Sequence, residues 1–387
     1  MKKQMLVLSI AAALSGISVA QAEVTLFDYQ EASSAYEEAY VTGSLNAGKS
    51  RDDAQTQYNL NVNAFYDRTI STPDRDFDYG GYLQGTVSRA GTKDAEKNDS
   101  YDVGANAAVF NYFQPGSNGA FWYGSVEAQD TDKFDKLKSS ATVGLGYGRV
   151  VNATPMAKAM RIVEELAQRN LLAAKPSKSV YQELAKLISR EDEYFSRYRN
   201  LPDNEYEARW LGDMEAVLLN AGVLKKSGAI STLSMRDVLF DENIFTRKIG
   251  WRVRAGVGYQ FSDGYDGDNG DPSLEVVGEY HMPVGRYAQF SDEATLSTTL
   301  GDDKVFQFDN DLSYSYEVDD SLDWINGWKL SYNDDSEITK NTLTSEVVYE
   351  LNSTLDLASG ITVTNYDGSS DDGTDTSFHT SVRYRLR

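Results

Sequence analysis

The chain has 387 residues, a formal charge of −22 and no cysteine. Its length suits one large domain or two ordinary ones, and the absence of thiols excludes disulfides, thiolate metal sites and thiol catalysis. So acidic a surface repels nucleic acid, which is therefore excluded as a partner. The acidic excess is uneven, because residues 153–247 hold 14 basic and 14 acidic side chains.

The N-terminus has the three parts of a secretory signal peptide. Lys2 and Lys3 form a positive start, an apolar run follows, and Ala-Gln-Ala at 20–22 matches a small-x-small cleavage site. The apolar run is too short for a transmembrane helix. We therefore expect residues 1–22 to be removed and the mature protein to start near Glu23.

Alternating segments fill residues 23–152 and predict about six strands. The stretch YNLNVNAFYD shows the pattern, with its largely apolar face formed by Tyr58, Leu60, Val62, Ala64 and Tyr66. Asparagines at 59, 61 and 63 occupy the other face. Such a period of two is that of a strand whose two faces meet different surroundings.

The period changes within residues 139–170. Alternation up to about residue 150 gives way to apolar residues at helical spacing, with Thr154 expected as the cap and Pro155 at the first helical position. Two more amphipathic helices follow, in SVYQELAKLISRE and YEARWLGDMEAVLLNAGVL. We predict a helical insert over residues 153–247, whose apolar stripes either pack on each other, dock a partner or plug a barrel mouth.

Alternation resumes after residue 247 and predicts about eight more strands in residues 248–387, making about 14 in total. A soluble β-sandwich or solenoid and a closed membrane barrel both produce many such strands. Segments of about ten residues or more, each with one apolar and one polar face, favour the barrel. Aromatic residues near strand ends and long acidic loops alternating with short turns favour it as well.

These features resemble Gram-negative outer-membrane β-barrel, porin-like proteins. The resemblance implies an all-β transmembrane antiparallel barrel in the outer membrane, with lipid as its surroundings. If the mature N-terminus is periplasmic, the sixth strand runs inward and the helical insert lies in the periplasm. Such proteins often end on an aromatic residue, whereas this chain ends RYRLR, so Tyr384 or Leu386 would have to replace it.

Charged residues on the polar strand faces are expected to line the lumen. They are Arg252, Arg254, Asp309, Asp311, Glu317, Lys329, Glu346, Glu350, His379, Arg383 and Arg385. If facing strands hold opposite charges, a transverse field orients polar solutes in the pore; if the charges pair directly, they close it. Glycine pairs at 144–148 and 256–258 lack a nucleotide-binding context and are expected to relieve crowding or allow bending of the wall.

Candidate chemistry is sparse. His379 shares its face with Ser377 and Ser381, which suggests a weak hydrolase site, although inward polar residues of a wet lumen have the same pattern. His281, the other histidine, follows Glu279 on an inward face and reads the same way. Aspartates of the acidic loops, Asp266, Asp268 and Asp271, are weak Ca²⁺ candidates, because EF-hand spacing is absent.

Three functions therefore remain open. The leading one is a channel with a polar lumen, passing small hydrophilic solutes or an exported polymer and partly gated or occupied by the helical insert. The second is a non-conducting envelope protein whose insert docks a periplasmic partner, with Tyr194 and Trp210 as docking candidates. The third is a barrel-embedded hydrolase; no cofactor is expected for any of them.

Overall fold

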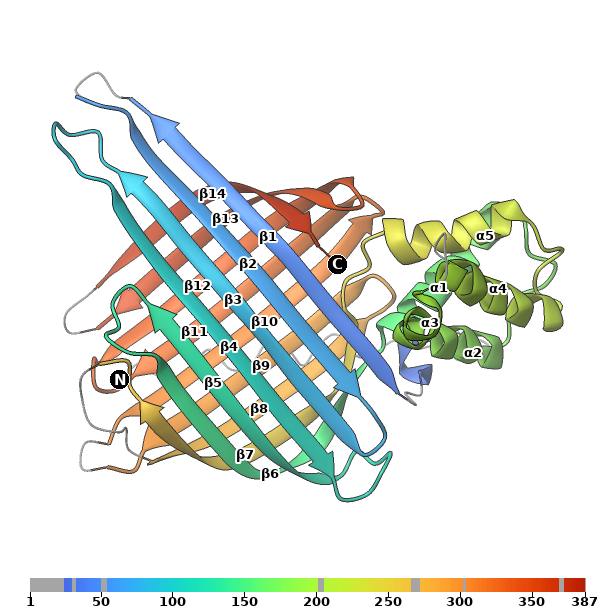
Figure 1. Cartoon of the computed structure of the whole chain (residues 1–387), viewed down its shortest axis with the longest axis horizontal. Coiled ribbons are helices and arrows are strands. Elements are labelled where there is room, and N and C mark those ends of the chain that lie inside the picture. The colour runs from blue at the N-terminus through green and yellow to red at the C-terminus, as the bar shows by residue number, and fades with distance from the viewer. Residues whose placement is uncertain are drawn as a thin grey trace, which may run out of the picture.

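The chain folds into a closed antiparallel β-barrel with a helical subdomain at one end (Figure 1). The computed structural model describes residues 24–29, 33–49, 54–200, 205–265, 272–301, 304–368 and 372–386. Residues 1–22, the predicted signal peptide, lie outside this part. Within the described residues the barrel has 14 strands and its α-helices lie between the sixth and seventh, which confirms the predicted fold class.

Every strand pairs with its neighbour in sequence, and β1 pairs with β14 to close the wall. The strands before the helices are β1 Ser34–Gly48, β2 Gln57–Ser71, β3 Arg75–Arg89, β4 Asn98–Tyr112, β5 Ala120–Thr131 and β6 Lys138–Asn152. Those after the helices are β7 Lys248–Ser262, β8 Pro272–Val284, β9 Ala288–Thr299, β10 Phe306–Asp319, β11 Leu322–Asn333, β12 Ile338–Asn352, β13 Leu355–Asp367 and β14 Gly373–Arg385.

The alternation in sequence becomes an inside and an outside. Large apolar side chains point outward and are exposed, among them Leu60, Val143, Val257, Leu343, Ile361 and Phe378. Their neighbours along each strand face the interior, because successive side chains of a strand point to opposite faces. No second sheet covers the outer face of the described barrel, so a soluble sandwich is excluded.

The two ends of the barrel differ. Short turns, at residues 72–74, 285–287, 320–321 and 353–354, lie at the end that carries the helices. The opposite end has longer connections, such as residues 49–56, 90–97 and 263–271. Longer connections thus alternate with short turns along the chain, as the sequence pattern predicts.

The helical subdomain, residues 154–241, contains α1 Thr154–Gln168, α2 Lys178–Ile188, α3 Glu191–Tyr198, α4 Glu205–Asn220, α5 Ala229–Arg236 and the π-helical turn η2 Asp237–Asp241. Before β1 lies a short 3₁₀ helix, η1 Leu26–Asp28. The apolar stripes pack on each other around a core that includes Met156, Ile162, Leu166, Leu184, Met214 and Leu218. None of the helices in the described chain is long and apolar enough to cross a membrane.

The start of α1 differs from its prediction. The capping position is Ala153, and Thr154 is already the first helical residue. The Thr154 hydroxyl donates to Asn152 Oδ1 and accepts from the Arg247 backbone N–H at 2.9 Å. Thr154 therefore ties the entry of the subdomain to its exit, and the Asn152 side chain accepts from the first backbone N–H of α1 at 2.9 Å.

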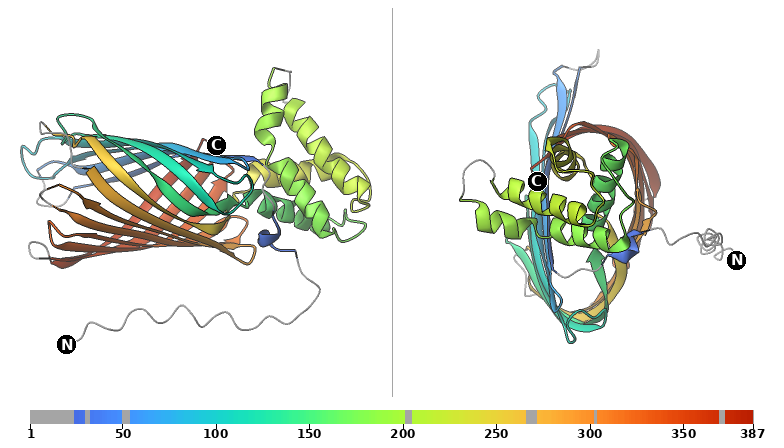
Figure 2. Two further views of the ribbon diagram at one scale, coloured as in Figure 1. Left: turned by 90° about the horizontal axis from the view of Figure 1, so that it is seen from below. Right: turned by 90° about the vertical axis from the view of Figure 1, so that its right-hand side faces the viewer.

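The subdomain lies beyond the barrel mouth and does not enter the lumen (Figure 2). Viewed along the barrel, the helices stand in front of the opening, and the barrel itself is flattened, with a narrow corner near β5 to β7.

Glycines make this narrow corner possible. A Cβ at Gly146 would lie 2.2 Å from Phe121 Cζ, and one at Gly256 would lie 2.3 Å from the Tyr123 hydroxyl. Bare backbone at these positions gives both rings room on the inner face. The expectation that these glycines relieve crowding in the wall is thus confirmed.

Candidate functional site: the lumen and its helix-side mouth

All the charged residues predicted to line the lumen lie on the inner face of the wall. Their ion pairs follow the wall between strands. Lys329 Nζ is 2.7 Å from Asp311 Oδ2 on the neighbouring strand. Arg385 reaches Asp356 at 2.7 Å and Glu350 at 3.0 Å. The sequence left open either a transverse field across the pore or direct pairing of the charges. These charges pair directly, but they do so along one wall and not across the lumen.

The ion pairs of the narrow corner reach farther around the wall, because one of them joins β7 to β3. Arg252 of β7 lies 2.5 Å from Glu279 of adjacent β8 and 3.7 Å from Asp78 of β3. Its guanidinium carbon sits 3.8 Å from the centre of the Phe110 ring. Charge pairs and aromatic rings together fill the corner and leave the free lumen on the other side.

Arg149 closes the same corner nearer the mouth, and sequence reasoning missed it. Its guanidinium is 2.8 Å from Asp76 Oδ1 and donates to the carbonyls of Thr72 and Pro73 in the β2–β3 turn. Gly148 before it has φ 102°, in the left-handed region that favours glycine. That glycine was the available signal for a local break in the strand pattern.

The free lumen contains a cavity of about 790 Å³ beside β8 to β12. Its polar lining includes His281, Glu293, Asp309, Asp311, Lys329 and Lys340. This volume falls in the range of small-molecule sites, about 300–1,000 Å³. The lining offers both charge signs and hydroxyl groups to a small hydrophilic solute.

A strap, defined as residues 242–247, runs from the helical subdomain to β7 across the barrel mouth. The Thr246 hydroxyl donates to Tyr36 of β1. Arg247 Nη2 donates to Glu317 of β10 at 2.6 Å, and the Arg247 side chain is fully buried. Since β14 to β11 separate β1 from β10 around the wall, these two bonds fix the strap to well-separated parts of the mouth.

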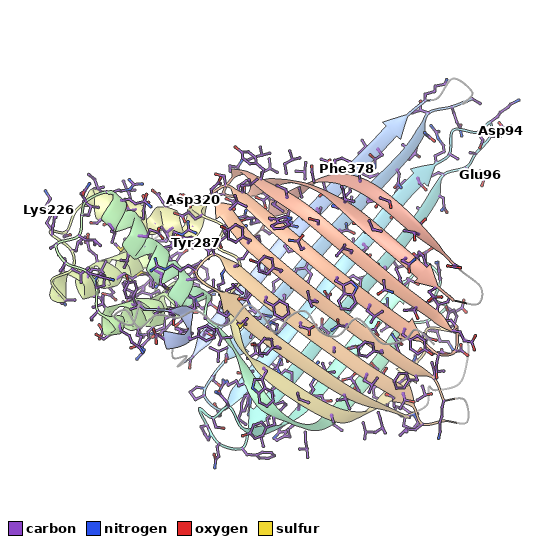
Figure 3. All side chains as sticks on the ribbon, turned by 180° about the vertical axis from the view of Figure 1, so that it is seen from behind. Asp94, Glu96, Lys226, Tyr287, Asp320 and Phe378 are labelled. Carbon is purple, nitrogen blue, oxygen red and sulfur yellow. The ribbon has the colours of Figure 1, made fainter. Side chains whose placement is uncertain are left out.

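The helical subdomain is held to the same end of the barrel by further ion pairs and hydrogen bonds. Arg161 of α1 donates to Glu317 at 2.8 Å and pairs with Asp320 in the β10–β11 turn. The Tyr287 hydroxyl, in the β8–β9 turn, donates to Glu164 at 3.0 Å. Figure 3 labels Tyr287 and Asp320 at this junction.

Glu242 of the strap has a raised pKa. Burial raises its pKa to about 7, and the carboxylates of Asp320, Glu165 and Glu317 add to the increase. The Arg161 guanidinium, 3.5 Å from Glu242, opposes it. Glu242 thus changes charge near neutral pH at the point where subdomain, strap and barrel meet.

A second cavity, of about 350 Å³, lies between the subdomain and the mouth. Tyr36, Glu38, Lys158, Asp192, Arg383 and Arg385 contribute to its lining. Burial lowers the pKa of the Lys158 ammonium. Strap residues 242–246 also line this cavity, so the mouth is covered without being filled.

The predicted hydrolase residues do not form a nucleophilic pair. His379 Nε2 lies 3.0 Å from Glu346 Oε2, and no hydrogen bond within the described residues joins it to Ser377 or Ser381. A serine–histidine contact occurs instead at His281, whose Nδ1 is 2.9 Å from Ser291 Oγ. His281 Nε2 is 3.3 Å from Glu279 Oε2. These two residues share one face of β8 in the sequence pattern, whereas no spacing links them to Ser291 on β9.

The docking candidates of the subdomain differ in exposure. Trp210 is 1% exposed and donates from Nε1 to the Leu187 carbonyl at 2.7 Å, so the prediction that it docks a partner is wrong. Tyr194 packs partly against the subdomain core and donates its hydroxyl to Asp213. The calcium candidates Asp266, Asp268 and Asp271 lie outside the described residues. Among the described residues, no group of three or more histidine, aspartate or glutamate side chains is arranged to hold a metal ion.

Comparisons with known proteins describe the fold more than the function. A family model described as "Protein of unknown function, DUF481" matches residues 243–352. No curated protein matches the chain.

Among solved structures, a bacterial polysaccharide outer membrane secretin is similar at 8% identity and TM-score 0.32, covering 91% of this chain and 98% of that one. OprB of Pseudomonas putida is similar at 7% identity and TM-score 0.33, covering 91% and 93%. Omp33 of Acinetobacter baumannii is similar at 8% identity and TM-score 0.31, covering 92% and 99%. The secretin and Omp33 are outer-membrane proteins by name, and the similarity to each of the three is distant.

Proposed function

We propose that the chain is a channel of the Gram-negative outer membrane that passes small hydrophilic solutes and is covered at its periplasmic mouth by the strap and the helical subdomain. One observation carries the proposal: a closed wall has an exposed apolar outer face and an ionisable inner face. Lipid stabilises the apolar outer face and water stabilises the ionisable inner face. Only a membrane-spanning barrel has lipid outside its wall and water inside it.

The lumen supports passage of small solutes. Ion pairs along the wall leave space between opposite walls, and the cavity of about 790 Å³ is lined by hydroxyl and charged groups. An exported polymer has less support, because the filled corner and the strap reduce the cross-section. The mature chain outside residues 153–247 carries the whole acidic excess, so cations are the favoured solutes.

The difference between the two ends supports an orientation in the membrane. In outer-membrane barrels the turns are short on the periplasmic side and the loops longer outside. The short turns lie at the end with the helices, which supports a periplasmic subdomain. Its position over the mouth, and the hydrogen bonds of the strap to β1 and β10, support a role in controlling access.

Planar-bilayer recording of the purified full chain tests the channel. We expect discrete conductance steps and a reversal potential displaced toward that of the cation in a salt gradient. A variant in which a Gly-Ser linker replaces residues 154–247, and so removes subdomain and strap together, serves as the ungated reference. Absence of conductance from both proteins contradicts the channel, whereas conductance from the reference alone identifies a closed gate.

A second candidate function rests on the Ser291–His281–Glu279 contacts. A serine that contacts a histidine, which in turn contacts a carboxylate, can be activated for attack on an ester. Both Ser291 and His281 line the lumenal cavity. Labelling with a fluorophosphonate and mass spectrometry test this candidate. Modification of Ser291, lost in His281→Ala, supports it. Ser331, which donates to Asp309 at 2.7 Å, is the control, and equal labelling of both serines contradicts it.

A further inference from the structure

The ladder between β1 and β14, which closes the wall, is short. Within the described residues, β1 and β14 are joined by four residue pairs, from Tyr40–Arg385 to Gly43–Val382. The same two strands are paired along most of their length on their other sides, β1 with β2 and β13 with β14. We define the seam as residues 44–48 of β1 and 377–381 of β14, the facing stretches beyond the last pair.

The seam lies at the depth of the apolar outer face. Phe378 of β14 is 73% exposed and pairs with Ile361, which is itself exposed. On the other edge Leu45 is 65% exposed beside Leu60. Figure 3 labels Phe378 at the upper edge of the wall, where the blue N-terminal strands diverge from the red C-terminal ones. Hydrocarbon therefore surrounds the seam from outside.

The inner side of the seam is polar. By alternation Ser377, His379 and Ser381 of β14 face the lumen, as do Ser44 and Asn46 of β1. Next to them β12 and β13 carry inward threonines, and the hydroxyls of Thr344 and Thr362 lie 3.3 Å apart. Hydroxyl and amide groups thus line the lumen where the wall is unpaired.

Unpaired backbone N–H and C=O groups are strongly unfavourable in hydrocarbon, because lipid tails offer them no hydrogen bond, so the seam requires an occupant that supplies hydrogen bonds. We propose that the seam is a lateral binding site for an amphiphile with a hydroxylated headgroup, such as a glycolipid. The headgroup lies in the lumen against the serines and Asn46, and bonds the free backbone groups. The alkyl chain leaves between Leu45 and Phe378 into the membrane.

Two features favour an amphiphile over an added strand. β1 and β14 are antiparallel to each other, so a single inserted strand is necessarily parallel to one of them and cannot form antiparallel ladders with both. The seam is also polar on its inner side and apolar on its outer side. An amphiphile matches both sides, because its headgroup contacts the polar side and its alkyl chain contacts the apolar side.

The absence of cysteine from the chain makes the seam accessible to disulfide trapping. Leu45→Cys with Thr380→Cys places thiols at facing positions beyond the last pair, and Val41→Cys with Tyr384→Cys is the control within the paired part. In vesicles with oxidant we expect the control pair to form a disulfide and the seam pair to be joined only by a longer bis-maleimide. Equally efficient disulfides in both pairs overturn the open seam.

The occupant is tested with a diazirine-bearing alkyl maltoside added to the full chain in phospholipid vesicles. We expect labelling of residues 44–48 and 377–381 several-fold above that of inward Thr295 on β9, reduced when the bis-maleimide bridges the seam. Equal labelling at Thr295, or labelling unchanged by the bridge, overturns lateral entry. Disulfide-linked dimers from the seam cysteines overturn the amphiphile in favour of a second copy. Conductance is recorded separately, so failure of the channel does not affect this result.

Discussion

The Glu317 carboxylate accepts hydrogen bonds from two arginines that belong to different segments, Arg161 of α1 and Arg247 of the strap. Its side chain is 4% exposed and that of Arg247 is fully buried. Removing one partner of a buried ion pair costs about 3–5 kcal/mol, because the other charge is left uncompensated. Glu317 therefore holds both subdomain and strap to the mouth.

Glu317→Gln should release the strap and raise the open probability of single channels. The matched control is Asp311→Asn, which breaks the wall pair with Lys329 and leaves the strap contacts in place. Single-channel recording of both variants beside the wild type provides the measurement. An unchanged open probability in Glu317→Gln contradicts the role of this carboxylate in closure.

A methyl group in the narrow corner should destabilise the barrel. Gly146→Ala places a Cβ within 2.2 Å of the Phe121 ring, whereas Gly43→Ala meets nothing within 4 Å. Overpacking costs about 1–3 kcal/mol, so Gly146→Ala should lower the urea midpoint of unfolding in micelles and Gly43→Ala should leave it nearly unchanged. The same midpoint for both variants is inconsistent with a packed corner.

At the scale of elements, neighbouring residues of one strand meet different solvents. Leu343 of β12 is exposed on the outer face and Thr344 faces the lumen. Arginine on the lipid face of a barrel costs about 2–4 kcal/mol near the bilayer centre, whereas lumenal positions tolerate charge. Leu343→Arg should reduce folding yield in vesicles, and Thr344→Arg should change ion selectivity instead. Equal yields contradict lipid as the outer surroundings.

The strap should respond to pH through Glu242, whose pKa is raised from 4.5 to about 7 in the closed mouth. A carboxyl with a raised pKa binds its proton more tightly in the docked state, so docking weakens as pH rises from about 4.5 to about 7 and then levels off. Open probability should therefore increase between pH 5 and pH 8. Glu242→Gln should abolish this increase, and a retained pH response in that variant contradicts the assignment.

At the scale of the whole molecule, the subdomain should be separable from the barrel. It has its own apolar core, and Asn152 and Lys248, on either side of subdomain and strap, are a paired position of the β6–β7 ladder. Replacing residues 154–241 by a short linker, with the strap retained, should leave a heat-modifiable barrel on gels and raise conductance less than removal of the strap as well. An unfolded barrel contradicts this independence.

The sequence predicted the architecture because a period of two and a period of 3.6 are local properties. The strands, the change of period near residue 150 and the inward face of Glu317 were all accessible in this way. The strap was not, because residues 242–247 have no periodicity and their partners lie on β1 and β10. Trp210 was misassigned because one amphipathic stripe does not reveal which other stripe covers it.

The β6–β7 ladder joins strands separated by 95 residues of chain, residues 153–247. The entropy lost in closing a flexible loop grows with the logarithm of its length. When the helices fold first, the hydrogen bond from the Ala153 N–H to the Arg247 carbonyl brings the two chain ends together. The insert then acts as a prefolded turn, and the two halves of the wall meet as though a tight hairpin connected them.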